Sequence, residues 1–174
     1  MADVSYGDTA PETVNVVIEI QKGSVNKYEL DKATGRIFLD RVNGTASLGY
    51  PADYGYVPDT LCDDGDPLDA LLLIDESVLP GIVVPCRPIG VLKMIDDGEG
   101  DEKLICVAAD DVTKSHIKSL DDLGPNFKPM IEHFYGQYKA WKKNWTGSPV
   151  SFDGWGDASE AKQIIAASIE SAKN

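Results

Sequence analysis

Short runs of apolar residues, some alternating with polar ones, fill the first two thirds of the chain. Residues 14–20 form one mostly apolar run, and segments 25–31 and 36–41 flank a turn that contains Gly35. Short apolar runs, a period of two residues and a glycine-bearing turn are strand and hairpin signals. We therefore expect a strand at 14–20 and a β-hairpin at 25–41.

Further extended segments follow in the middle of the chain. Strands are expected at 70–74, 82–95 and 103–109, with a short one in the structured loop 43–60 and another around 150–152. Two prolines in the long segment indicate an edge position or a bulge, and Gly90 indicates a close backbone approach or a bend. We expect the strand-rich first two thirds of the chain to form a small, twisted barrel.

Beyond residue 110 the apolar positions recur at the helical period. An apolar stripe over 127–141 predicts a helix that begins at Pro125 or Asn126 and ends at 144–147. A final helix begins at Asp157, which has a glutamate three residues further on, as in a capping box. We expect these two helices to pack on the barrel, in a mainly β fold of the α+β class.

The composition is that of a soluble globular protein with one domain, residues 1–174. Hydrophobic residues make up 43% of the chain and charged residues 26%. No apolar run approaches the roughly 18 residues of a membrane span, and the acidic N-terminus lacks the basic and apolar regions of a signal peptide. We therefore expect a cytoplasmic protein that has no membrane partner.

Charge and metal-binding residue types exclude several functions. The net charge of −13 works against nucleic-acid and anionic-membrane partners, which need a basic face. The three cysteines match no zinc or redox spacing and are expected to be reduced thiols. The two histidines are too few for a histidine-built metal site.

Carboxylates concentrate in two loops, 63–69 and 96–102, and each loop adjoins an apolar strand. The first loop holds four carboxylates in seven residues without a cation among them. Such close like charges repel unless a cation neutralises them. If the strands are neighbours, the loops meet at one end of the barrel. An all-oxygen donor set favours Mg²⁺, with Mn²⁺ and Ca²⁺ as competitors, and the number of carboxylates favours several ions.

A site with several divalent ions suits phosphoryl transfer. Two ions about 3.5–4 Å apart clamp the attacking and leaving oxygens and lower the pKa of bound water. Phosphate oxygens also need cationic and hydroxyl partners, for which the candidates are Lys27, Arg41, Lys103, Lys139, Tyr54 and Tyr138. Each of these alone is more often a surface residue, but together with two acidic loops they favour a phosphate site.

Other uses of the first acidic loop fit less well. An EF-hand loop that begins at Asp64 needs glycine at its sixth position, where Asp69 stands. An aspartyl-phosphate phosphatase has its DxD motif directly after an apolar strand, whereas here the strand follows the motif. Two classes stay open as alternatives, a Ca²⁺-binding structural protein and an OB-like nucleic-acid module, although the charge argues against the module.

The segment 64–70, Asp-Gly-Asp-Pro-Leu-Asp-Ala, matches the D-x-D-P-hydrophobic-D signature of family I soluble inorganic pyrophosphatases at every position. The chain resembles this family from about Val14 to the final helix. Further blocks that carry the resemblance are 17–20, 26–29, 39–41, 50–56, 87–94, 133–135, 138–139 and 154–155. The length is similar to that of the prokaryotic, hexamer-forming branch.

The resemblance implies a five-stranded OB-like barrel with helices outside. It implies Mg²⁺-dependent hydrolysis of pyrophosphate to two phosphates, and assembly of the chain as a homohexamer. Mn²⁺ is expected to substitute for Mg²⁺, and Ca²⁺ to inhibit, because its coordination is looser. A metal-bridging water attacks directly, so no covalent intermediate is required.

The resemblance also implies roles for individual residues. The implied metal ligands are Asp64, Asp69, Asp96 and Asp101, with Glu19 as a possible further one. Asp66 is the implied general base, with Tyr54 close to it. The implied phosphate-binding residues are Lys27, Arg41, Tyr138 and Lys139, supported by Lys103 and Glu29. Asp63 is given no role and is expected to be solvated.

Overall fold

The structure is a computed structural model that describes residues 4–31, 33–42, 48–139 and 150–173. Its strands are β1 Val14–Ile20, β2 Asn26–Asp31, β3 Arg36–Val42, β4 Asp53–Tyr56, β5 Asp69–Leu73, β6 Val83–Asp96, β7 Glu99–Gly100, β8 Lys103–Ala108 and β9 Ser151–Asp157. Its helices are the short 3₁₀ turns η1 Val112–Lys114 and η2 Leu120–Leu123 and the α-helices α1 Phe127–Gln137 and α2 Ala158–Ser171.

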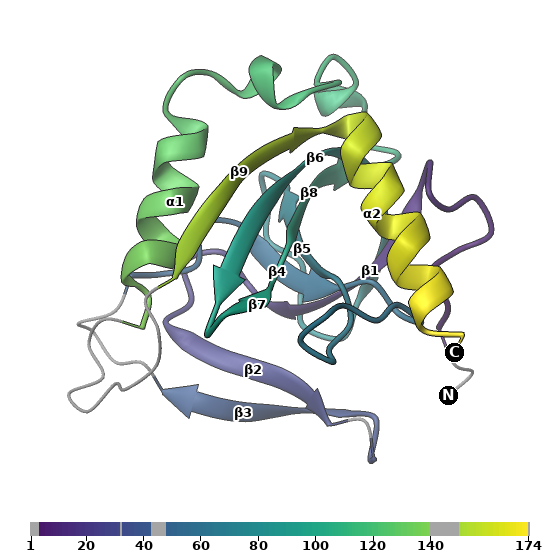
Figure 1. The fold of residues 1–174 in the computed structure, drawn as a ribbon, viewed down its shortest axis with the longest axis vertical. Coiled ribbons are helices and arrows are strands. Elements are labelled where there is room, and N and C mark those ends of the chain that lie inside the picture. Colours follow the sequence, from purple (N-terminus) through teal and green to yellow (C-terminus); the bar gives the residue numbers. More distant parts are fainter. Residues whose placement is uncertain (1–3, 32, 43–47, 140–149, 174) are drawn as a thin grey trace.

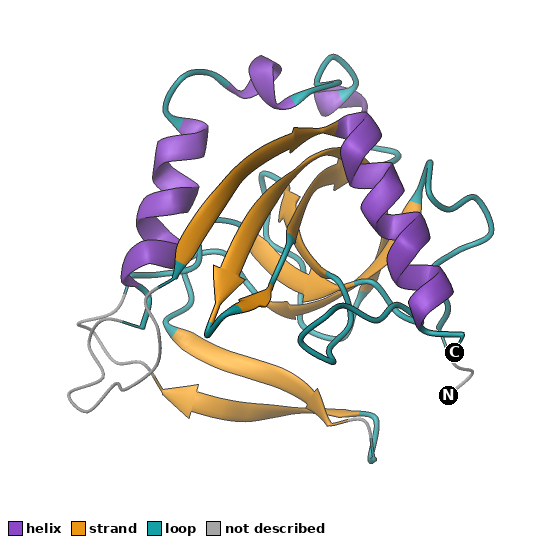
Figure 2. Cartoon of the chain, in the orientation of Figure 1, coloured by secondary structure: helices purple, strands orange, loops and turns teal. Residues whose placement is uncertain are grey.

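Five strands close into a ring, which confirms the expected five-stranded barrel with two packed helices (Figure 1). The ring runs β1–β4–β5–β8–β6 and returns from β6 to β1. Only β5 and β8 pair in parallel within it. Strand β9 pairs with β6, and the β2–β3 hairpin forms a sheet of its own beside the ring (Figure 2).

Alternate residues of the barrel strands face two hydrophobic cores. Leu71 and Ile105 belong to the core that includes Ile131 and Phe134 of α1. The neighbouring residues of the same strands belong to the second core, which includes Ile165 of α2. This division follows from the period of two residues in a strand, and it places α1 and α2 on different faces of the barrel wall.

Gly90 lies where β6 packs against η2. The expected bulge and the expected close approach are both found there. The pairing of β6 with β8 shifts register between Pro88 and Gly90. A Cβ atom on Gly90 would lie only 2.4 Å from Cγ of Leu120. The close approach therefore requires glycine at this position.

Replacing Gly90 with alanine should destabilise the protein, because the buried Leu120 side chain must move to make room. We expect Gly90→Ala to lower the free energy of unfolding by about 1–3 kcal/mol in urea titrations. The control is Gly136→Ala on the exposed side of α1, where a Cβ meets nothing within 4 Å. Equal stabilities of the two variants would contradict this packing argument.

Some element boundaries differ from the predictions. Helix α1 ends at Gln137 with Tyr138 as its C-cap, whereas the predicted end at 144–147 lies outside the described residues. Strand β9 is longer than the predicted 150–152. The start of α2 is confirmed, because the Asp157 side chain accepts a hydrogen bond of 2.9 Å from the backbone N–H of Glu160.

Strand β1 is not an edge strand, since it pairs with β4 on one side and with β6 on the other. Glu19, in this strand, is buried. The three cysteines are free thiols, as predicted. In the part of the chain that the structure describes, no helix is long and apolar enough to cross a membrane.

Candidate active site

One large open pocket lies between the β2–β3 hairpin and one end of the barrel. Every residue to which the sequence assigned a site role lines it, although the roles themselves stay predictions. These residues are Glu19, Lys27, Glu29, Arg41, Tyr54, Asp64, Asp66, Asp69, Asp96, Asp101, Lys103, Tyr138 and Lys139. The pocket thus gathers side chains from strands, loops and α1 that lie far apart in the sequence.

The two acidic loops meet because β5 and β8 are neighbouring parallel strands. Asp69, at the start of β5, is paired in register with Lys103, at the start of β8. The loop that precedes each strand therefore lies at the same end of the barrel. A Cβ atom on Gly100 would lie 3.6 Å from Oδ2 of Asp63, so the two loops are also in contact through this backbone.

Lys103 joins the two acidic loops. Its side chain is 3% exposed, and its Nζ lies 2.6 Å from Oδ2 of Asp69 and also donates to Oδ1 of Asp101. Burial alone would lower the pKa of Lys103, but the two carboxylates outweigh it and raise that pKa above its ordinary value. The lysine is therefore a permanent internal cation of the site.

Asp96 forms a second carboxylate–cation contact, with Lys139, at the other side of the site. Its Oδ2 accepts hydrogen bonds from Lys139 and, at 3.3 Å, from the hydroxyl of Tyr138. Its Oδ1 is buried and has no hydrogen-bond partner among the described residues. A buried carboxylate oxygen of this kind is suited to a cationic ligand.

The carboxylates of the pocket carry more negative charge than the two lysines balance. Burial is the main cause that raises the pKa of Asp64 and of Asp101, and the neighbouring aspartates raise both further. Asp66 lies in the same loop, and its backbone N–H donates to Oδ1 of Asp64 at 3.0 Å. The donor set is therefore rich in hard, incompletely neutralised oxygens, which fits Mg²⁺ or a similar ion.

The fit to a metal ion rests on the chemistry of these donors. Among the described residues, no three aspartate, glutamate, histidine or cysteine side chains converge on one point. Ammonium groups stand between the carboxylates instead, with Lys103 between Asp69 and Asp101 and Lys139 on Asp96. Small side-chain movements would be needed for these carboxylates to share an ion.

Glu19 reaches the pocket from β1 and is hydrogen-bonded to the β2–β3 hairpin. Its Oε1 accepts a hydrogen bond of 2.8 Å from the backbone N–H of Leu30. Burial raises the pKa of Glu19 to about 7, and the charges of Asp69 and Glu29 raise it further, against the effect of that hydrogen bond. Near neutral pH the buried side chain is therefore poised between its two protonation states.

The raised pKa predicts a pH-dependent stability in protein treated with a chelator. Between about pH 4.5 and pH 7 the folded state keeps a proton on Glu19 that the unfolded state releases, so the free energy of unfolding falls as pH rises. The contribution is about 3 kcal/mol, at about 1.4 kcal/mol per pKa unit. Urea titrations across this range should show a flatter dependence for Glu19→Gln, and parallel curves would contradict the assignment.

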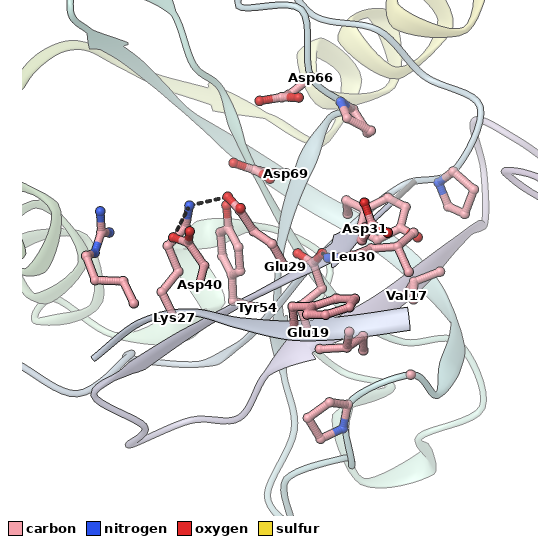
Figure 3. A pocket seen from close by; sticks show the side chains of 18 of the residues that line it. Val17, Glu19, Lys27, Glu29, Leu30, Asp31, Asp40, Tyr54, Asp66 and Asp69 are labelled. Atoms are coloured by element: carbon pink, nitrogen blue, oxygen red, sulfur yellow. Dashed lines mark hydrogen bonds and ion pairs between the residues drawn. The ribbon is translucent and has the colours of Figure 1, made fainter. Parts of the chain in front are cut away.

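Tyrosine side chains form the wall between the acidic loops and α1. Tyr54 is hydrogen-bonded to Asp69, and burial, followed by the charge of Asp69, raises its pKa well above the ordinary value. In the view of Figure 3, Asp69 lies above Tyr54, and Asp66 lies further above, beyond Asp69. Tyr50 packs against Tyr54 and Phe134, with ring centroids 5.3 and 4.9 Å away.

The hairpin supplies the cationic wall. Lys27 and Arg41 are cross-strand partners in β2 and β3. Lys27 forms ion pairs with Glu29 and, at 3.5 Å, with Asp40 (Figure 3). Asp40 was assigned no site role from the sequence, because alternation places it on the opposite face of β3 from Arg41. The pairing of β2 with β3 shifts register at this point, between Lys27 and Tyr28.

Tyr135 is a second pocket residue to which the sequence analysis gave no role. It lies three residues before Tyr138 on α1, a spacing that puts both side chains on one face of a helix. That spacing was the available signal, but in the sequence it could equally indicate core packing.

Comparison with known proteins shows the family of this chain. The family model for inorganic pyrophosphatase matches residues 16–173. The chain is 46% identical to an inorganic pyrophosphatase of Xanthomonas campestris, over 96% of this chain and 93% of that protein. It is 50% identical to one of Leifsonia xyli, over 88% of this chain and 91% of that protein. The crystal structure of inorganic pyrophosphatase from Thermus thermophilus superposes with a TM-score of 0.92 at 44% identity, covering 99% of this chain and 98% of that one.

Fold, pocket and comparisons together define a hydrolase with an OB-like barrel. The chain belongs to the inorganic pyrophosphatase family. The expected membership of the prokaryotic family I enzymes is confirmed by the bacterial relatives and by the fold.

Proposed function

We propose that this protein hydrolyses inorganic pyrophosphate to two orthophosphates, with several Mg²⁺ ions bound by the acidic loops. The observation that carries the proposal is a pocket in which two carboxylate loops face a set of lysine, arginine and tyrosine side chains. Family membership supports the substrate, and the all-oxygen donor set supports Mg²⁺, with Mn²⁺ as a substitute.

The donor residues divide into two groups. Asp64, Asp69 and Asp101 would hold the principal ion, and Asp96 and Glu19 would serve further ones. Bound Mg²⁺ supplies charge neutralisation of the phosphates and a water of lowered pKa. Lys103 holds Asp69 and Asp101 near each other through its two hydrogen bonds, so small side-chain movements would let these carboxylates share an ion.

Asp66 would act as the general base. It is exposed toward the pocket and lies in the same turn as Asp64. A carboxylate is a sufficient base for a water of lowered pKa, and the attack of that water on phosphorus needs no covalent enzyme intermediate. Tyr54, hydrogen-bonded to Asp69, would orient the reacting oxygens beside this base.

The cationic residues would hold the phosphate oxygens. Lys27 and Arg41 come from the hairpin, and Tyr138 and Lys139 come from the end of α1. Glu29 would position Lys27 through their ion pair. Cations on opposite walls suit a substrate with two anionic phosphates, because each phosphate meets positive charge from a different side.

The assembly and location follow from the same family resemblance. We propose that the whole chain acts as one catalytic domain in a cytoplasmic homohexamer. Sedimentation equilibrium should give a mass of about six chains, and a monomeric mass would contradict this part of the proposal.

A phosphate-release assay tests the function. Purified protein with Mg²⁺ should release phosphate from pyrophosphate, Mn²⁺ should substitute for Mg²⁺, and chelation of the metal should stop the reaction. Adding Ca²⁺ to the Mg²⁺ reaction should inhibit it, because Ca²⁺ occupies the same oxygens with longer and less regular bonds. Activation by Ca²⁺ would contradict the proposed metal site, and no release with any divalent ion would contradict the enzyme.

A further inference from the structure

Tyr135 is a pocket residue that the proposed function leaves without a task. Its side chain is 2% exposed, and it lines the same pocket as Asp69, Asp101 and Lys103. Its ring meets those of Phe134 and Tyr138 edge-on, at centroid distances of 5.0 and 5.4 Å. Packing within α1 therefore fixes where the hydroxyl of Tyr135 lies.

That hydroxyl is buried and has no hydrogen-bond partner among the residues that the structure describes. Buried polar groups are almost always paired, and an unpaired one costs about 1–3 kcal/mol. Phenylalanine would fill the same space without this cost. The neighbouring tyrosine hydroxyls differ, since that of Tyr54 bonds Asp69 and that of Tyr138 bonds Asp96.

The surroundings of Tyr135 make its hydroxyl a donor rather than an anion. Burial, together with the charges of Asp69 and Asp101, holds the pKa of Tyr135 well above its ordinary value. The Lys103 ammonium lies 5.7 Å from the centroid of the Tyr135 ring. The hydroxyl thus offers a neutral O–H beside a cation whose own hydrogen bonds go to two carboxylates.

We propose that the Tyr135 hydroxyl donates a hydrogen bond to an oxygen of a phosphate group bound in this pocket. The inference rests on the proposed function, because it adds a contact to the same substrate and product. A phosphate group presents several anionic oxygens, and a neutral donor binds one of them without adding charge to the crowded carboxylates. Tyr135 would then act with Tyr138, on the same face of α1.

The test measures the affinity of Tyr135→Phe for inorganic phosphate, by isothermal titration calorimetry in the presence of Mg²⁺. We expect affinity for phosphate to fall by about tenfold or more, as for a hydrogen bond to a charged group, and KM for pyrophosphate to rise. The melting temperature without phosphate should stay the same or increase, because an unpaired buried hydroxyl is removed. Stabilisation of the variant by phosphate should be smaller than that of the wild type.

The matched control is Tyr28→Phe. The Tyr28 hydroxyl accepts a hydrogen bond of 3.2 Å from Nδ2 of Asn26 in the hairpin, and Tyr28 does not line the pocket. This variant should bind phosphate as the wild type does.

Two results would overturn the inference. One is wild-type phosphate affinity in Tyr135→Phe, and the other is a melting temperature that falls without phosphate as much as with it, which indicates a structural role only. Failure of the proposed function looks different. In that case the wild type releases no phosphate from pyrophosphate, whatever the phosphate affinity of the two tyrosine variants.

Discussion

Asp66→Asn should lower kcat for pyrophosphate hydrolysis by a factor of about 10²–10⁴, the usual contribution of a general base. Asparagine has nearly the same shape as aspartate but cannot accept the proton of the attacking water. Asp66 is exposed, so the fold and the melting temperature should change little. The measurement is kcat from initial rates of phosphate release, with circular dichroism to confirm the fold.

Asp63→Asn is the matched control for this variant. Asp63 lies in the same acidic loop, is also exposed, and has no assigned role. It removes the same charge from the same loop, so it corrects for any general loss of metal affinity. We expect near wild-type kcat for Asp63→Asn. Full activity in Asp66→Asn, or an equal loss in both variants, would contradict the base assignment.

Lys103→Met should remove both activity and much of the stability. The substitution leaves the carboxylates of Asp69 and Asp101 close together without their shared ammonium group. Removing one partner of a buried ion pair typically costs about 3–5 kcal/mol. We expect a loss of this size in the free energy of unfolding of chelator-treated protein, and the loss should be smaller at pH 4 than at pH 8, because protonation relieves the repulsion.

Lys93→Met serves as the control for Lys103. Lys93 pairs with Glu160 at 2.9 Å, but its side chain is 30% exposed. Exposed ion pairs contribute about 0–1 kcal/mol, so this variant should unfold nearly as the wild type does. Adding Asp101→Asn to Lys103→Met should restore part of the lost stability. A Lys103→Met protein as stable as Lys93→Met would contradict the role of Lys103 as the internal cation.

Most of the barrel was predictable from local patterns, because each of its strands except β4 carries a clear signal of its own. The apolar run at 14–20 and the turn at Gly35 are local features, and both elements are found. The burial of Glu19 was not predictable in this way. It depends on β1 pairing with β4 on one side and β6 on the other, and such pairing joins segments far apart in the chain.

The candidate site was predictable as a set of residue types and not as a geometry. Two acidic loops beside apolar strands indicate a metal site, whatever the order of the strands in the sheet. Only the parallel pairing of β5 with β8 shows that Asp69 and Lys103 start neighbouring strands. Tyr135 was missed because an aromatic residue on the apolar stripe of a helix gives the same signal whether it packs in the core or lines a pocket.

The central claim is that the carboxylates of the two acidic loops hold the metal ions that hydrolysis requires. Crystals soaked with Mn²⁺ and inspected by anomalous scattering test this most directly. The account predicts peaks in the pocket against Asp64, Asp69 and Asp101, and a loss of those peaks in Asp69→Asn. Peaks confined to other parts of the surface, in a protein that releases phosphate from pyrophosphate with Mn²⁺, would contradict it.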